Sequence, residues 1–287
     1  MRVIELSDHP GEMLRQARQR RDEGDRQAQR RDADALARHQ DRVAQAQSAR
    51  DQARAGRRWL SWLTGVLAVR RARRQVPLAA ARASAPSHRE QAVAAGVQGE
   101  QSAQADLGAA LGDEWTLVRG YRNRRGEIDH LLLGPVGVLA IEVKNRNGVI
   151  TCAGDRWLIT RYDRYGNRVR APEPLTDNGG RSPSEQLNQP ADDLAAFLRS
   201  RGHAVTIRRI VWFTHRRARL GTCTDPTVHV AFSASQVLSL ISRSPATISS
   251  ADRAGIEQLI IKDHRFHAGR RAQRGSTPGQ QPGRHPR

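Results

Sequence analysis

The run Gly-Val-Leu-Ala-Ile-Glu-Val-Lys at residues 137–144 constrains the fold most, because it sets two charges at the end of an apolar strand. Apolar residues at both odd and even positions predict a strand buried on both faces. The charges are Glu142 and Lys144. The chain has 48 Lys and Arg residues, yet only Lys144 and Lys262 are lysines. A lysine is a compact charge whose pKa responds to burial, whereas an arginine stays charged. The position therefore favours chemistry that uses an ammonium group.

The sequence Gly134-Pro-Val-Gly137 predicts a tight turn that joins strands at 127–133 and 138–145. A turn centred between its proline and its valine sets Asp129 opposite Glu142. Side chains alternate along a strand, so Lys144 shares their face of the sheet. The opposite face is expected to carry Ile128, Leu132, Leu139, Ile141 and Val143.

Two carboxylates that face each other in an apolar sheet repel, and buried charge must be paired or must coordinate a metal. Ion pairing with Lys144 is the simpler alternative, but that group would keep a net negative charge. A hard divalent cation relieves the repulsion, because Mg²⁺ prefers carboxylate oxygens together with waters and substrate phosphate. We therefore predict a metal site at Asp129 and Glu142, with Lys144 orienting or deprotonating an attacking water.

The segments Gly-Glu-Ile-Asp-His-Leu-Leu-Leu (126–133), Gly-Val-Leu-Ala-Ile-Glu-Val-Lys-Asn (137–145) and Gly-Val-Ile (148–150) resemble a known family. This family is NERD, the nuclease-related domain of the restriction-endonuclease-like PD-(D/E)XK superfamily. The resemblance covers about residues 97–198. It implies an α/β fold, with a mixed β-sheet flanked by helices. It also implies a Mg²⁺- or Mn²⁺-dependent enzyme that hydrolyses phosphodiester bonds of nucleic acid, above all DNA.

The resemblance also assigns roles to the hairpin residues. Asp129 and Glu142 match the metal-binding carboxylates, and the backbone carbonyl of Val143 is a further metal ligand. Lys144 matches the catalytic lysine of the family.

Two residues outside the hairpin carry further roles by the same resemblance. Glu100, in Gly99-Glu100, matches an outer acidic residue facing the metal; the alternative is an ordinary solvated helix glutamate. Gln186 matches the last residue of the family's Asn-Pro-x-x-Gln and is expected to steady the site. Here that segment begins with Ser182, a departure that weakens the transfer, and the alternative for Gln186 is first-turn helix chemistry alone.

The net charge of +19 and the pI near 11.5 favour polyanionic partners, with nucleic acid first and anionic membrane second. A nonspecifically basic protein remains the bland alternative. A non-catalytic nucleic-acid-binding module with the same fold is another.

Residues 1–75 are predicted to form a helical extension, because 11–56 are rich in Ala, Arg and Gln. Sparse apolar positions favour a solvated arm over a stable coiled coil. The apolar segment 59–69 is too short to span a bilayer. Within the basic stretch 57–74 it is either an interfacial helix, which would make the chain a membrane-peripheral adaptor, or a short packed helix.

The remaining chain divides by composition. Residues 76–88 are predicted to be a linker, 89–264 the nuclease-like domain, and 265–287 a disordered basic tail. A β meander is expected to continue through residues 149–152 and 157–162. Helices are expected at 184–199 and 251–263.

The two cysteines, Cys152 and Cys223, are too few for a zinc framework and are expected to be reduced thiols. Residues 1–10 lack the apolar core of a secretion signal, so a cytoplasmic location is expected.

Overall fold

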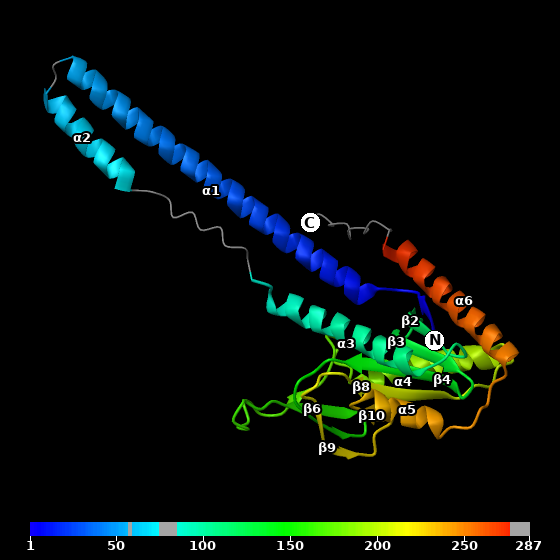
Figure 1. The fold of residues 1–287 in the computed structure, drawn as a ribbon. Coiled ribbons are helices and arrows are strands. Elements are labelled where there is room, and N and C mark those ends of the chain that lie inside the picture. The colour runs from blue at the N-terminus through cyan, green and yellow to red at the C-terminus, as the bar shows by residue number, and fades with distance from the viewer. Residues whose placement is uncertain (57–58, 75–84, 276–287) are drawn as a thin grey trace, which may run out of the picture. The chain divides into compact units, whose positions relative to one another are not determined.

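The computed structural model describes residues 1–56, 59–74 and 85–275 (Figure 1). The chain separates into two compact units. One unit combines residues 1–12 with residues 92–287, and the other contains residues 13–91. Every residue proposed for the site belongs to the first unit.

A six-stranded sheet forms the centre of the first unit. Its order is β1-β2-β3-β4-β8-β10, with antiparallel pairing among β2, β3 and β4 and parallel pairing elsewhere. The strands are β1 (Arg2–Glu5), β2 (Thr116–Arg122), β3 (Glu127–Gly134), β4 (Gly137–Lys144), β8 (Ile207–Phe213) and β10 (His229–Ala231). The predicted mixed sheet is confirmed, and β4 is a central strand in it.

Helices cover both faces of this sheet (Figure 1). On one face, side chains of α4 (Pro183–Ser200) and α6 (Ser250–Gly275) join the apolar core. On the other face, the core includes side chains of α3 (His88–Ala110) and α5 (Ala234–Ser242). Because β4 lies between two cores, its apolar residues are buried at every position, as the sequence pattern predicts.

A second sheet, rather than a continued meander, follows β4. Its order is β7-β6-β5-β9, from β5 (Val149–Ala153), β6 (Arg156–Thr160), β7 (Glu173–Pro174) and β9 (Arg219–Thr224). The turn-forming residues 145–148 separate it from β4. The strands after this turn were expected in the same sheet as β4, and that expectation is wrong.

Cys152 and Cys223 are joined by a disulfide, with Cα atoms 4.4 Å apart. The prediction of two separate reduced thiols is therefore wrong in this structure. The pairing was hidden because the cysteines are 71 residues apart in sequence and meet only through the parallel pairing of β5 with β9.

The register predicted for the hairpin is confirmed, since His130 pairs with Ile141 and Gly134 pairs with Gly137. The predicted alternation fails at one position. Ile128 was expected on the face opposite Leu131, yet both belong to the same core. The ladder between β2 and β3 skips Asp129 and the facing Gly120, whose φ is +65°. This irregularity turns Ile128 onto the other face.

The structure also differs from the prediction at the start of the helical extension and at the start of the C-terminal tail. Residues 2–5 form β1, which pairs with β2, rather than part of a helical extension. The closing helix α6 continues to Gly275, so residues 265–275 are not a disordered tail. The cause is that residues 266–275 contain helix-forming Ala, Arg and Gln and no proline. Residues 276–287, and residues 75–84 of the expected linker, lie outside the described residues.

The second unit contains most of α1 (His9–Ala55) and all of α2 (Trp59–Arg74). The long helix expected at 11–56 is thus confirmed. The helices meet closely at Gly65, where an added Cβ would lie 3.1 Å from the Cα of Arg50. On α2, Trp59, Leu60 and Leu67 remain exposed. No helix among the described residues is long and apolar enough to cross a membrane.

Gly120 is expected to be essential for the irregularity beside Asp129. Its φ is +65°, and an added Cβ would lie 2.2 Å from the carbonyl oxygen of Ser7. Gly120→Ala should therefore lower the free energy of unfolding by about 3 kcal/mol in urea titrations. Gly154→Ala is the matched control, because Gly154 also has a positive φ but no atom near the added Cβ. That variant should lose about 1 kcal/mol, and equal losses would contradict the steric argument.

Candidate active site

Asp129 marks the point where β3 and β4 part. The backbone pairing of these strands ends at His130 and Ile141. Beyond that pair, the Oδ2 atom of Asp129 accepts a hydrogen bond from the backbone N–H of Val143 at 2.7 Å. A side-chain carboxylate thus takes the place of a backbone acceptor. The carboxylate is thereby fixed beside the end of β4, where Glu142 and Lys144 lie.

Lys144 joins β4 to α4 through two hydrogen bonds. Its Nζ atom lies 2.6 Å from Oε1 of Glu142 and 2.8 Å from Oε1 of Gln186. Glu142 and Gln186 are both buried, whereas Lys144 is partly exposed. The structure therefore brings three of the residues singled out in the sequence, Glu142, Lys144 and Gln186, into direct contact.

The start of α4 holds Gln186 in this position. Ser182 is the N-cap, and it forms a reciprocal capping box with Glu185. The amide nitrogen of Gln186 donates to the carbonyl oxygen of Arg181 at 2.8 Å, which leaves its oxygen for Lys144. Serine and asparagine are both good N-cap residues, so the departure from Asn-Pro-x-x-Gln keeps the capping function. Gln186 combines a first-turn position with a contact to the site.

Glu100 reaches the site from α3. The ring nitrogens of buried His130 lie 2.7 Å from the carbonyl oxygen of Asp129 and 3.3 Å from that of Glu100. Burial lowers the pKa of His130 to about 4, so the ring is neutral and its single N–H donates to only one of these two carbonyl oxygens. The imidazole lies between the backbones of β3 and α3. The Glu100 carboxylate lies 3.9 Å from the guanidinium of Arg119.

The carboxyl groups of this site have raised pKa values. Burial, and then the charge of Asp129, raise the pKa of Glu142 to about 7 and that of Glu100 to about 9. Burial likewise raises the pKa of Asp129, against the opposing effect of Lys144. Burial alone would lower the pKa of Lys144, but Glu142 and Asp129 outweigh it and raise the pKa. Lys144 is therefore an ammonium, and the carboxylates around it are incompletely neutralised.

The donor set fits a hard divalent cation in chemistry. Asp129 and Glu142 supply carboxylate oxygens, and burial raises the pKa of both by more than the ammonium of Lys144 lowers it. Among the side chains that the structure describes, no three His, Cys, Asp or Glu groups are arranged as a metal site. The reason is local, since Glu142 bonds Lys144 and Asp129 bonds the Val143 N–H. Two carboxylates with the carbonyl of Val143 would leave remaining positions to water and substrate.

Two further residues contribute to the electrostatics and were not expected from the sequence. Glu127 raises the pKa of Glu100, Asp129 and Glu142, and it is paired with Arg122. Its position two residues before Asp129 was a signal, because alternation sets both on one side of a strand. Arg119 had no comparable signal, since its contact with Glu100 depends on how α3 packs.

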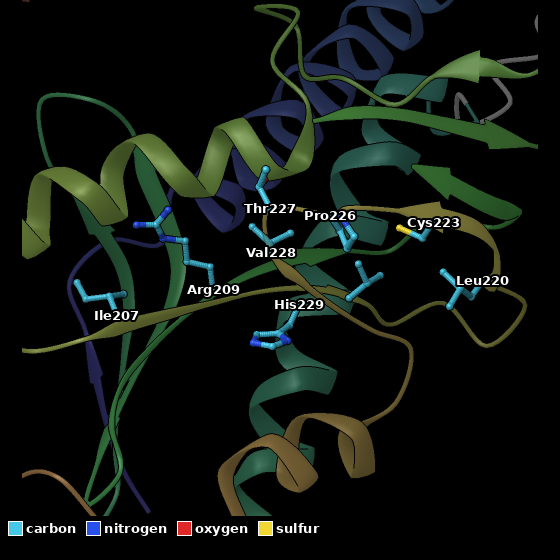
Figure 2. A pocket seen from close by; sticks show the side chains of 9 residues that line it. Ile207, Arg209, Leu220, Cys223, Pro226, Thr227, Val228 and His229 are labelled. Atoms are coloured by element: carbon cyan, nitrogen blue, oxygen red, sulfur yellow. The ribbon is translucent and has the colours of Figure 1, made fainter. Parts of the chain in front are cut away.

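A cavity of about 600 Å³ lies elsewhere, between β8, β9 and β10 (Figure 2). Its lining includes Ile207, at the end of β8 opposite Phe213, whereas Phe213 pairs with Lys144. Arg209 points from this cavity toward α4, where it bonds Asn188 and Asp192 (Figure 2). No carboxylate lines the cavity, so it lacks the ligands that a hydrolytic metal site requires.

The stabilising effect of Lys144 is expected to depend on pH. Without the ammonium, the pKa of Glu142 should rise further above 7, whereas its usual value is 4.5. Lys144→Met should therefore cost little at pH 5.5, where Glu142 is protonated in the folded state. The cost should grow to about 2 kcal/mol at pH 8.5, because Glu142 ionises beside the ammonium in the wild type, whereas the variant must keep the proton or bear an unpaired charge. Urea unfolding in EDTA at both pH values measures this difference.

Two variants control this measurement. Adding Glu142→Gln to Lys144→Met removes the acid and should remove most of the pH dependence. Arg265→Met deletes an exposed cation and should change stability equally little at both pH values. A loss for Lys144→Met that is the same at both pH values would contradict the assignment.

Comparisons with known proteins agree with the hairpin residues. A family model described as the nuclease-related domain, NERD, matches residues 95–214. This span contains every residue of the site described above. No curated protein and no solved structure gives a significant match. Residues 95–214 of the chain therefore match the nuclease-related domain family, NERD.

Proposed function

We propose that this protein is a Mg²⁺- or Mn²⁺-dependent nuclease that hydrolyses phosphodiester bonds, with DNA as its substrate. The observation that supports it best is the contact of Lys144 with both Glu142 and Gln186, beside Asp129. A partly exposed ammonium among buried carboxylates has no evident structural need, since apolar side chains would fill the same space at lower electrostatic cost.

Asp129 and Glu142 would hold the cation, together with the backbone carbonyl of Val143. A bound divalent cation supplies Lewis-acid activation of a water molecule and neutralises charge on the scissile phosphate. The raised pKa of Lys144 argues against a role as general base. Its ammonium instead holds the attacking water and stabilises negative charge on the phosphate oxygens. Gln186 positions Lys144, and Glu100 acts as an outer acid of the metal site.

A basic loop that follows β6 supports nucleic acid as the substrate. Residues 161–170 are all exposed and contain four arginines and one acid. That acid, Asp163, accepts hydrogen bonds from the backbone N–H groups of Tyr165 and Asn167 and so shapes the loop. Tyr165 is 72% exposed, with the guanidinium of Arg164 at 4.6 Å from its ring centroid. Arginine and exposed aromatic rings together favour phosphate and base contacts.

Two alternatives share the same chain. A non-catalytic nucleic-acid-binding module would keep salt-sensitive DNA binding without cleavage. A membrane-peripheral adaptor is favoured by the exposed Trp59, Leu60 and Leu67 of α2. Flotation with anionic liposomes, with and without residues 57–74, separates the second alternative, because unchanged flotation excludes that segment as the anchor. The nuclease proposal goes with a cytoplasmic location. The Cys152–Cys223 disulfide opposes that location, because disulfides are rare in cytoplasmic proteins.

Cleavage of plasmid and single-stranded DNA with Mg²⁺ or Mn²⁺ tests the nuclease directly. Glu142→Ala and Lys144→Ala should each lower the rate at least about 100-fold, because each removes a group that stabilises charge in the transition state. Glu114→Ala, at an exposed acid outside the site, is the matched control and should cleave like the wild type. Cleavage that survives both site substitutions would refute the proposal.

Cation binding should release protons, because ligands must be deprotonated. At pH 7, Glu100 with a pKa of about 9 and Glu142 with a pKa of about 7 still carry protons. Titration calorimetry with Mn²⁺ in buffers of different ionisation enthalpy should give about one proton per ion. Glu100→Gln should reduce this number if Glu100 faces the cation. An unchanged number would make Glu100 a structural acid.

A further inference from the structure

A cleft of about 560 Å³ between α4 and α6 has the composition of a nucleotide-binding surface. It is lined by two phenylalanines, Phe197 and Phe266, and by several cations. Phe266 is 57% exposed, which is unusual for so large an apolar side chain beside a cavity. The chain's second lysine, Lys262, also lines this cleft and has no role in the site described above.

The guanidinium group of an arginine lies over each of the two phenylalanine rings. The Cζ atom of Arg201 lies 5.5 Å from the centroid of Phe197, and that of Arg270 lies 5.5 Å from the centroid of Phe266. Aromatic faces flanked by arginine are the surfaces on which proteins stack the bases of single strands. A base stacked on Phe266 would set its phosphates beside Lys262.

The acids of the cleft are already used within the protein. Asp193 pairs with Arg124 at 2.6 Å. Asp263 accepts a hydrogen bond from the hydroxyl of Tyr121 at 2.5 Å and lies 3.6 Å from Nε2 of His267. The remaining cations at the cleft, including Lys262, therefore favour an anionic ligand.

The cleft is connected to the active site along α4. Gln186 lies in the first turn of this helix and Phe197 lies eleven residues later, about 17 Å away at 1.5 Å per residue. Between them lies the turn after β2, where Arg124 bonds Asp193 and the carbonyl of Arg125 accepts from Arg181. Arginines therefore border the whole path.

We propose that the cleft between α4 and α6 binds a single strand of nucleic acid, with a base on Phe266 and a phosphate on Lys262, at a distance from the reacting phosphate. This inference rests on the proposed nuclease function, since it extends the path of the substrate strand.

Fluorescence anisotropy of the full chain with a labelled twelve-nucleotide oligothymidylate in EDTA tests it. Phe266→Ala should raise Kd about tenfold, from the loss of one stacked base, without changing the salt dependence. Phe266→Trp should restore binding. Lys262→Ala should reduce the slope of log K against log salt by about 0.7, the effect of one phosphate contact on a single strand.

Arg265→Ala is the matched control, because Arg265 is exposed on α6 but does not line the cleft. Its salt slope should equal that of the wild type. A Kd for Phe266→Ala within twofold of the wild type, with an unchanged melting temperature, would overturn the proposal. So would equal slope changes for Lys262→Ala and Arg265→Ala, since these would indicate a generally basic surface.

The same proteins in the plasmid cleavage assay separate the two proposals. If the wild type cleaves but the cleft variants bind like the wild type, the cleft assignment is wrong and the nuclease stands. If the wild type does not cleave while the variants show the expected binding pattern, the nuclease is wrong and the cleft is a binding site. Displacement of the oligonucleotide by equimolar adenosine monophosphate would assign the cleft to free nucleotide and overturn the strand proposal.

Discussion

The hydrogen bond from the N–H of Val143 to the carboxylate of Asp129 is the contact on which the candidate site depends. It satisfies a backbone donor that would otherwise pair within the sheet, and unsatisfied buried donors are costly. Backbone pairing of β3 and β4 ends at His130 and Ile141, and this bond holds the carboxylate of Asp129 next to that last pair. The irregularity at Gly120 on the neighbouring strand accommodates the same residue. A local irregularity in the sheet therefore makes room for the carboxylate of Asp129.

Sequence patterns predicted the parts of this arrangement that depend on nearby residues. The turn before Gly137 sets the hairpin register, and the Ser182 cap sets the start of α4, because both act over a few residues. Contacts between distant segments had no such signal. The pairing of β1 with β2 and the disulfide from Cys152 depend on how whole elements pack. Ile128 was misassigned because alternation was assumed to continue past Asp129.

The charges of this protein are divided by location. The chain as a whole is strongly basic, whereas the candidate site gathers acids whose pKa values are raised first by burial and then by one another's charge. A basic surface attracts a polyanion at long range, and the acidic centre would repel its phosphates unless a cation is present. Under the proposed function, binding of a nucleic acid at the site would therefore depend on a cation held by these acids.

The near-absence of lysine has a practical consequence. Amine-selective reagents have few targets here, namely Lys144, Lys262 and the N-terminal amine, which bonds the carbonyl of Leu111. The two lysine targets coincide with the candidate active site and with the cleft between α4 and α6. Acylation followed by mass spectrometry would therefore report protection of each location separately in the unmodified protein. Few basic proteins allow their charged surfaces to be labelled so selectively.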